Sequence, residues 1–134
     1  MIEEGWDTNM MKNILVVDDD ISTLGIFRTL CANVNTQFIG LQNFRQLQIY
    51  VNMKVPLDID IVFIDIKLPI HDGYQVLDWI TNYALFPDAL FIAISANHDE
   101  LEKAQSAGFH GFIGKPFKIN NLSDIMTGTA LWVI

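Results

Sequence analysis

Short apolar runs alternate with amphipathic segments along this chain, five times in all. The runs are rich in Ile, Val and Phe and are too short for helices, which is typical of buried strands in a parallel sheet. This pattern predicts strands at 13–17, 36–41, 60–64, 90–94 and 111–113. The second of these runs is more polar than the others, so we expect it at an edge of the sheet.

The segments that follow these runs carry apolar residues at helical spacing. They predict helices over 21–33 and 43–53, a helix after Gly73, one from near His98 to just before Gly108, and one starting near Asn120 or Asn121. We expect Gly73 to be a structural residue where the third helix begins. Alternating strands and helices with right-handed crossovers indicate an α/β domain, a doubly wound parallel sheet with helices on both faces.

Composition narrows the class of protein further. The 134 residues fit one domain, and the formal net charge of −8 argues against direct nucleic-acid binding. No apolar run approaches the ~18 residues of a membrane span, so we expect no membrane insertion. Residues 1–12 are too acidic for a signal peptide. We therefore expect a flexible extension over 1–12, one domain over 13–134 and a cytoplasmic location.

Four of the predicted strands end in residues suited to phosphoryl chemistry. The first runs into Asp18, Asp19 and Asp20, the third into Asp65, the fourth into Ser95, and the fifth into Lys115, which precedes Pro116. In an open parallel sheet, ligands bind outside the carboxyl ends of the strands. We therefore expect acids, a hydroxyl and an amine to converge on one site.

The three consecutive acids repel one another unless a cation offsets their charge. Magnesium prefers a few carboxylates together with water in octahedral geometry. The other interpretation of such a triplet is helix capping at a helix N-terminus, which we favour for Asp20.

Four motifs carry a family resemblance: "ILVVDDD", "IVFIDIKLPIHDG", "IAISA" and "GKPF". In this order they resemble the receiver domain of two-component response regulators, and the chemotaxis regulator in particular, over residues 12–127. The resemblance implies a single flavodoxin-like (βα)5 domain with a five-stranded parallel sheet in the order 2-1-3-4-5.

The resemblance implies that Asp65 is the phosphoacceptor. It further implies that Mg²⁺ is bound directly by Asp19 and Asp65, through water by Asp18, and by the backbone carbonyl of Lys67. The Lys67 side chain would also tune how fast water reaches the phosphoaspartate.

The same resemblance assigns Ser95 and Lys115 to the phosphoryl oxygens. Phe112 would be the aromatic switch residue, which turns inward when Ser95 moves toward the phosphoryl group. Asn97 would tune hydrolysis, and the bond between Lys115 and Pro116 would be cis.

As a phosphorelay receiver, the protein would take its phosphoryl group from a sensor histidine kinase or a histidine phosphotransfer protein. It would catalyse its own phosphorylation and dephosphorylation without being a turnover enzyme. A downstream protein would then bind the face formed by the fourth helix, fifth strand and fifth helix, and homodimerisation is a further hypothesis.

Two alternatives stay open at this point. The first is a degenerate receiver that serves as a passive interaction module. The second is a phosphatase of the haloacid dehalogenase type, with Asp18 as nucleophile and with Ser95 and Lys115 in its second and third motifs. That family needs a late acidic cluster, whereas only Asp124 follows Lys115, and Asp65 would have no role.

The apolar tail "ALWVI" follows a break at 127–129 in the last predicted helix. Either the helix resumes and buries Trp132, or the segment 132–134 meets another surface as an exposed apolar patch. We favour burial.

Overall fold

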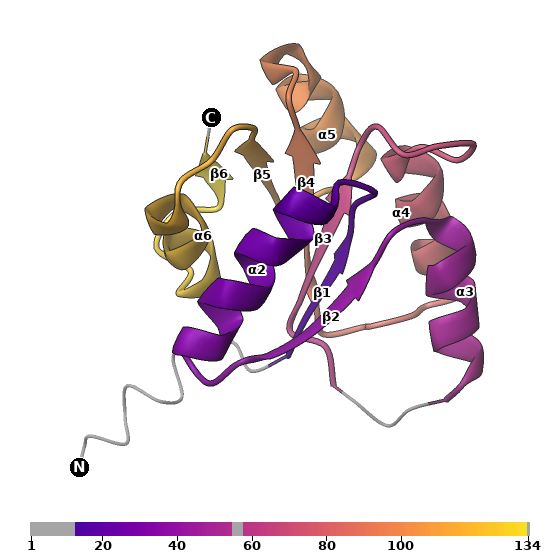
Figure 1. Cartoon of the computed structure of the whole chain (residues 1–134). Coiled ribbons are helices and arrows are strands. Elements are labelled where there is room, and N and C mark those ends of the chain that lie inside the picture. Colours follow the sequence, from indigo (N-terminus) through magenta and orange to yellow (C-terminus); the bar gives the residue numbers. More distant parts are fainter. Residues whose placement is uncertain (1–12, 55–57, 134) are drawn as a thin grey trace.

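In the part of the chain that the structure describes, residues 13–54 and 58–133, strands and helices alternate from end to end (Figure 1). This computed structural model contains the strands β1 (Asn13–Val17), β2 (Gln37–Leu41), β3 (Ile61–Asp65), β4 (Leu90–Ser95), β5 (Gly111–Gly114) and β6 (Trp132–Val133). Its helices are α2 (Ile21–Asn33), α3 (Phe44–Asn52), α4 (Gly73–Asn82), α5 (Leu101–Ala107) and α6 (Ile119–Met126), with the short 3-10 helix η1 (His98–Glu100) leading into α5. None of these helices has the length and apolar character of a membrane span. The expected flexible extension, residues 1–12, lies outside the described residues.

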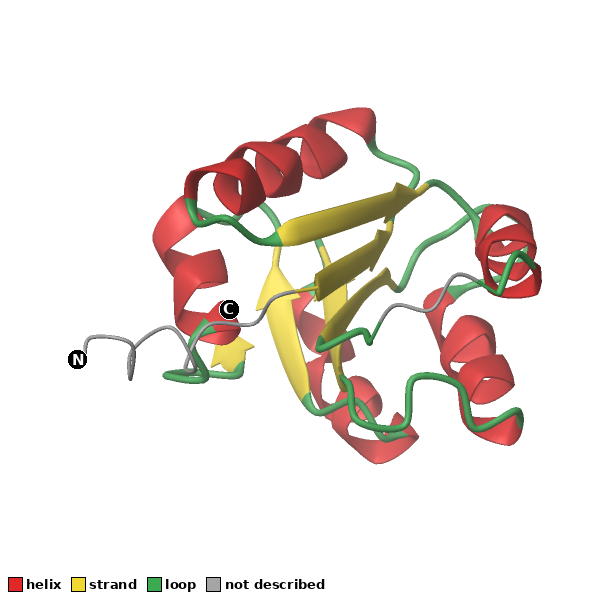
Figure 2. Cartoon of the chain, turned by 90° about the horizontal axis from the view of Figure 1, so that it is seen from below, coloured by secondary structure: helices red, strands yellow, loops and turns green. Residues whose placement is uncertain are grey.

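All neighbouring strands of the sheet are parallel, in the order β2-β1-β3-β4-β5-β6. Successive side chains of each strand point to opposite faces, so the strands contribute to two separate apolar cores. Helices α2 and α6 cover one core, and α3, α4 and α5 cover the other, so that one layer of helices lies on each face of the sheet (Figure 2). The predicted doubly wound α/β fold is therefore confirmed, with β2 at an edge.

The predicted strand count is wrong, because the described residues form a six-stranded sheet. The last helix ends at Met126 and does not resume. Gly128 has a φ of 77°, in the left-handed region that glycine tolerates, and the Thr129 N–H donates to the Asp124 carbonyl at 2.8 Å. This turn sends the tail back along β5.

The tail forms β6 because β5 would otherwise be an edge with unpaired backbone groups. The Phe112 N–H donates to the Leu131 carbonyl at 2.8 Å. Trp132 stays 36% exposed, so its expected burial in a resumed helix is wrong, and Ile134 lies outside the described residues. Gly111 permits this pairing, because an added Cβ would meet the Leu131 carbonyl oxygen and come 2.6 Å from Ile92 Cδ1.

The last helix also begins earlier than predicted. Its N-cap is Lys118, and neither Asn120 nor Asn121 takes that position. Asn121 Oδ1 instead accepts the Lys118 N–H at 2.9 Å from inside the first turn. An amide satisfies a backbone donor from either position, so the asparagines locate the helix start but not its first residue.

The contact at Gly111 predicts that Gly111→Ala detaches β6. The Phe112 N–H would lose its acceptor, so we expect its amide to exchange at least roughly tenfold faster in NMR hydrogen-exchange measurements. The matched control is Gly25→Ala in α2, where an added Cβ has nothing within 4 Å. That change should leave Phe112 protected and stabilise the helix by about 0.5–1 kcal/mol. Unchanged protection of Phe112 in Gly111→Ala would contradict this account of the edge.

Candidate functional site

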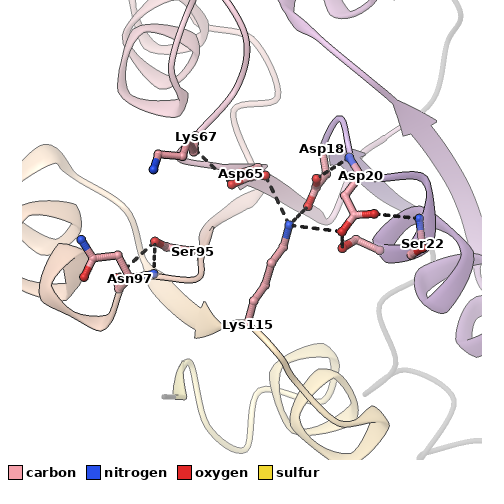
Figure 3. A network of polar contacts seen from close by, with 9 residues as sticks. Asp18, Asp20, Ser22, Asp65, Lys67, Ser95, Asn97 and Lys115 are labelled. Carbon is pink, nitrogen blue, oxygen red and sulfur yellow. Dashed lines mark hydrogen bonds and ion pairs between the residues drawn. The ribbon is translucent and has the colours of Figure 1, made fainter.

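The carboxyl ends of β1, β3, β4 and β5 lie side by side, as the strand order requires. They bring Asp18, Asp65, Ser95 and Lys115 to one edge of the sheet (Figure 3). A cavity of about 650 Å³ opens at this edge. Its lining comprises Asp19, Asp65, Ile66, Lys67, Leu68, Pro69, Ser95, Ala96, Asn97, Glu100 and Lys115.

The Lys115 ammonium lies among the acids of this site. Its Nζ is 3.0 Å from Asp18 Oδ2, 3.4 Å from Asp65 Oδ2 and 4.0 Å from Asp20 Oδ2. Asp18 is fully buried and Asp65 is 5% exposed, so both carboxylates need a nearby positive charge. The Lys115–Pro116 bond is cis, the form that the family resemblance implied.

Two of the acids share one arrangement of their oxygens. Asp18 Oδ1 accepts the Asp20 N–H at 2.9 Å, and Asp65 Oδ1 accepts the Lys67 N–H at 3.1 Å. In each case the other oxygen, Oδ2, faces the ammonium. The backbone therefore fixes each carboxylate and leaves one oxygen directed at the centre of the site.

These acids fit a divalent cation. Ligand oxygens of Asp18, Asp19 and Asp65 all lie within 4.8 Å of one another. The buried Asp18 Oδ2 has the Lys115 ammonium, 3.0 Å away, as its partner. Carboxylate oxygens are the ligands that Mg²⁺ prefers. A role for the Lys67 carbonyl in this ligand set stays a prediction.

Burial raises the pKa of Asp65 to about 7, and the negative charge of Asp18 adds to this effect. The Lys115 ammonium and the Lys67 N–H act in the opposite direction. A further cation at the acids would favour the ionised form, which is the form able to act as a nucleophile.

Ser95 lies at the cavity but is engaged elsewhere. Its Oγ accepts the Asn97 N–H at 3.0 Å and donates to the Asn97 carbonyl at 3.2 Å, as Figure 3 shows. The hydroxyl must give up its donation to the Asn97 carbonyl before it can donate to a group on Asp65. Phe112 is already fully buried, in the core that it shares with α4 and α5. It therefore has no exposed position from which to make the predicted inward turn.

Gly73 holds α4 against the end of β3. Its N–H donates to the Ile66 carbonyl at 2.8 Å, and an added Cβ would lie 2.5 Å from the Asp65 carbonyl oxygen. Such a contact leaves no room for a side chain, which explains physically why this position is a glycine. Asp20 caps α2 as expected, since its carboxylate accepts the Ser22 N–H at 2.9 Å.

Two further residues, Glu100 at this cavity and Tyr74 in contact with Glu100, were not expected from the sequence. Glu100 is part of the lining, and its Oε1 accepts a hydrogen bond from the Tyr74 hydroxyl at 2.6 Å. Burial and, to a lesser extent, this bond raise the pKa of Tyr74. The two residues are 26 positions apart on different elements, so no spacing in the sequence indicates their contact.

Comparison with known families agrees with this geometry. A sequence profile described as the response regulator receiver domain matches residues 14–127. This is most of the chain, so the chain belongs to the response regulator receiver domain family. It is a receiver domain of the two-component response regulator class.

Relatives carry this domain both alone and within larger proteins. The chemotaxis protein CheY of Halobacterium salinarum is 26% identical over 122 residues, 88% of this chain and 99% of CheY. The peroxide stress-activated histidine kinase mak1 of Schizosaccharomyces pombe is 25% identical over 122 residues, but this chain spans 7% of its length. The solved receiver domain of Ssk1 from Saccharomyces cerevisiae, bound to the histidine phosphotransfer protein Ypd1, shares the fold, with a TM-score of 0.74, 19% identity and 88% coverage of each chain.

The environment of Asp65 predicts that the metal-free fold loses stability as the pH rises. Its pKa is about 7 in the fold against an ordinary 3.8, so between these values the folded state holds a proton that the unfolded state releases. We expect the free energy of unfolding in EDTA to fall by on the order of a few kcal/mol between about pH 4 and pH 8.

Urea titrations of the wild type and of Asp65→Asn measure this effect. The variant should lack this part of the pH dependence, and Mg²⁺ should restore stability to the wild type at alkaline pH. Identical pH profiles for the two proteins would contradict the assignment to Asp65.

Proposed function

We propose that this receiver accepts a phosphoryl group on Asp65 in the presence of Mg²⁺ and passes the signal on through protein contacts. The convergence of Asp18, Asp19, Asp65 and Lys115 on one edge of the sheet carries this proposal. Asp65 has its Oδ1 fixed by a backbone N–H and its Oδ2 directed into the site, which suits a carboxylate nucleophile.

The residues would share the work of one displacement. Asp19, Asp65 and the backbone carbonyl of Lys67 would hold Mg²⁺ directly, and Asp18 would hold it through water. The bound ion supplies positive charge that offsets the negative charge of the phosphoryl oxygens. An oxygen of Asp65 attacks phosphorus while the bond from phosphorus to the donor's imidazole nitrogen breaks. The Lys115 ammonium would stabilise charge on a phosphoryl oxygen.

Phosphorylation would then draw Ser95 away from Asn97. Donation of the Ser95 hydroxyl to a phosphoryl oxygen replaces its donation to the Asn97 carbonyl at 3.2 Å. This change biases an equilibrium between two arrangements of the loop after β4. Phe112 would respond by repacking within the core, and Lys67 and Asn97, which line the cavity, would tune the access of water.

The phosphoryl donor would be a phosphohistidine of a sensor histidine kinase or of a histidine phosphotransfer protein. The related receiver of Ssk1 is bound to Ypd1, a protein of the second kind. The resulting role is that of a phosphoacceptor that catalyses its own reaction, without substrate turnover. The net charge of −8 accords with a protein that does not bind nucleic acid directly, and its location would be cytoplasmic.

The downstream partner would bind the face formed by α5, β5 and α6. Because β6 lies along β5, this face includes the partly exposed Trp132. We propose that the same face also supports homodimerisation.

A phosphorylation assay tests the proposed function. Incubation of the wild type with acetyl phosphate and Mg²⁺ should add the mass of one phosphoryl group, and Asp65→Asn should abolish the addition. Asp78→Asn is the matched control, because Asp78 is an exposed carboxylate on α4 away from the cavity. Label that survives in Asp65→Asn but disappears in Asp18→Asn would support the dehalogenase-type phosphatase. A wild type that takes no label would favour the passive interaction module.

A further inference from the structure

The Ser95 hydroxyl is connected to the far side of the cavity through one carbonyl group. The Asn97 carbonyl accepts both the Ser95 hydroxyl, at 3.2 Å, and the Glu100 N–H, at 3.1 Å. Asn97 also caps η1, since its Oδ1 accepts the Asp99 N–H at 2.9 Å. The position of Ser95 is therefore tied to the position of η1, which ends at Glu100.

The side chain of Glu100 continues this connection to the first turn of α4. Its Oε1 accepts the Tyr74 hydroxyl at 2.6 Å, a short bond to a charged acceptor. The Tyr74 ring is itself held, with the Phe109 ring packed edge-on at 6.1 Å and the Lys103 ammonium 4.6 Å from the ring centre. These contacts leave the ring little freedom to follow Glu100 if η1 moves.

The backbone of Tyr74 is also held in place, by its neighbour Gly73. Gly73 packs against the backbone of Asp65 and bonds to the Ile66 carbonyl at 2.8 Å. The loop after β3 is thus anchored to the phosphoacceptor strand. The hydrogen bond from the Tyr74 hydroxyl to Glu100 connects the segment after β4 to that anchor.

We propose that the Tyr74–Glu100 hydrogen bond is a latch that holds Ser95 in its turn with Asn97 and so opposes the phosphorylated arrangement. Movement of Ser95 toward Asp65 takes away one of the two donors to the Asn97 carbonyl and shifts η1, which stretches the latch. Tyr74 is then a positioning residue that acts on the switch through Glu100 and touches no phosphoryl group. This proposal rests on the proposed function, because it concerns the response of the same site.

Loss of the latch should raise the population of the arrangement that binds a phosphoryl mimic. A bond present only in the resting arrangement lowers the apparent affinity for any ligand that needs the other arrangement. Tyr74→Phe removes the hydroxyl and keeps the ring, so the contacts with Phe109 and Lys103 persist. We expect Tyr74→Phe to bind beryllofluoride, in the presence of Mg²⁺, roughly threefold to tenfold more tightly than the wild type.

Isothermal titration calorimetry with beryllofluoride and Mg²⁺ measures this change, and Tyr83→Phe is the matched control. Tyr83 is 67% exposed on the far end of α4, so its variant should bind as the wild type does. Two changes at Glu100 separate the hydrogen bond from the charge. Glu100→Ala removes both, whereas Glu100→Gln removes the charge but keeps an oxygen that accepts the Tyr74 hydroxyl. The alanine variant should therefore bind more tightly than the glutamine variant.

A second measurement tests the resting state alone. Without beryllofluoride, the amides of Asn97 and Glu100 should exchange faster in Tyr74→Phe than in the wild type, while the variant stays folded and its Mg²⁺ affinity stays close to that of the wild type. Equal or weaker beryllofluoride binding by Tyr74→Phe overturns the latch. A wild type that binds no beryllofluoride overturns the proposed function, and the latch with it.

Discussion

Two buried carboxylates beside each other are the constraint on which this site depends. Asp18 is fully buried and Asp65 is 5% exposed, and like charges in such surroundings destabilise a fold unless a cation offsets them. Lys115 follows directly after β5, two strands away from β3 in the sheet, and provides that charge at 3.0 Å from Asp18 and 3.4 Å from Asp65. The parallel strand order makes this reach feasible, and the raised pKa of Asp65 shows that one ammonium does not fully compensate.

The same site contains the Ser95 hydroxyl, which forms its hydrogen bonds with Asn97 in this arrangement. Ser95 is satisfied by its own turn, so the resting arrangement needs no ligand to complete its hydrogen bonds. A negative group on Asp65 would compete for that hydroxyl, and the loop after β4 would have to release it. Because Asn97 and Glu100 share this loop, a local change in charge has a route to α5 and to the surface beyond the cavity.

The sequence predicts the convergence of these side chains because four of the five apolar runs end in an acid, a hydroxyl or the lysine. Parallel strands place their carboxyl ends together, so Asp65 and Lys115 could be expected to meet although 50 residues separate them. Other features leave no such signal. The rotamer of Ser95 depends on its hydrogen bonds to the Asn97 backbone, and the contact of Tyr74 with η1 depends on how η1 packs against α4. The strand β6 has two residues, too few for any periodicity, and its pairing depends on Gly111.

The central claim is that the acids form one cation site, and a calorimetric Mg²⁺ titration tests it most directly. The wild type should bind one ion near neutral pH. Asp19→Asn should lose this binding, because it removes one carboxylate from the cluster. The variant should still fold, because Asp19 is the exposed member of the cluster and its change leaves the core intact. Asp124→Asn, an acid on α6 outside the cluster, should bind as the wild type does. Equal Mg²⁺ binding by the wild type and Asp19→Asn, or no binding by the wild type, would contradict the account.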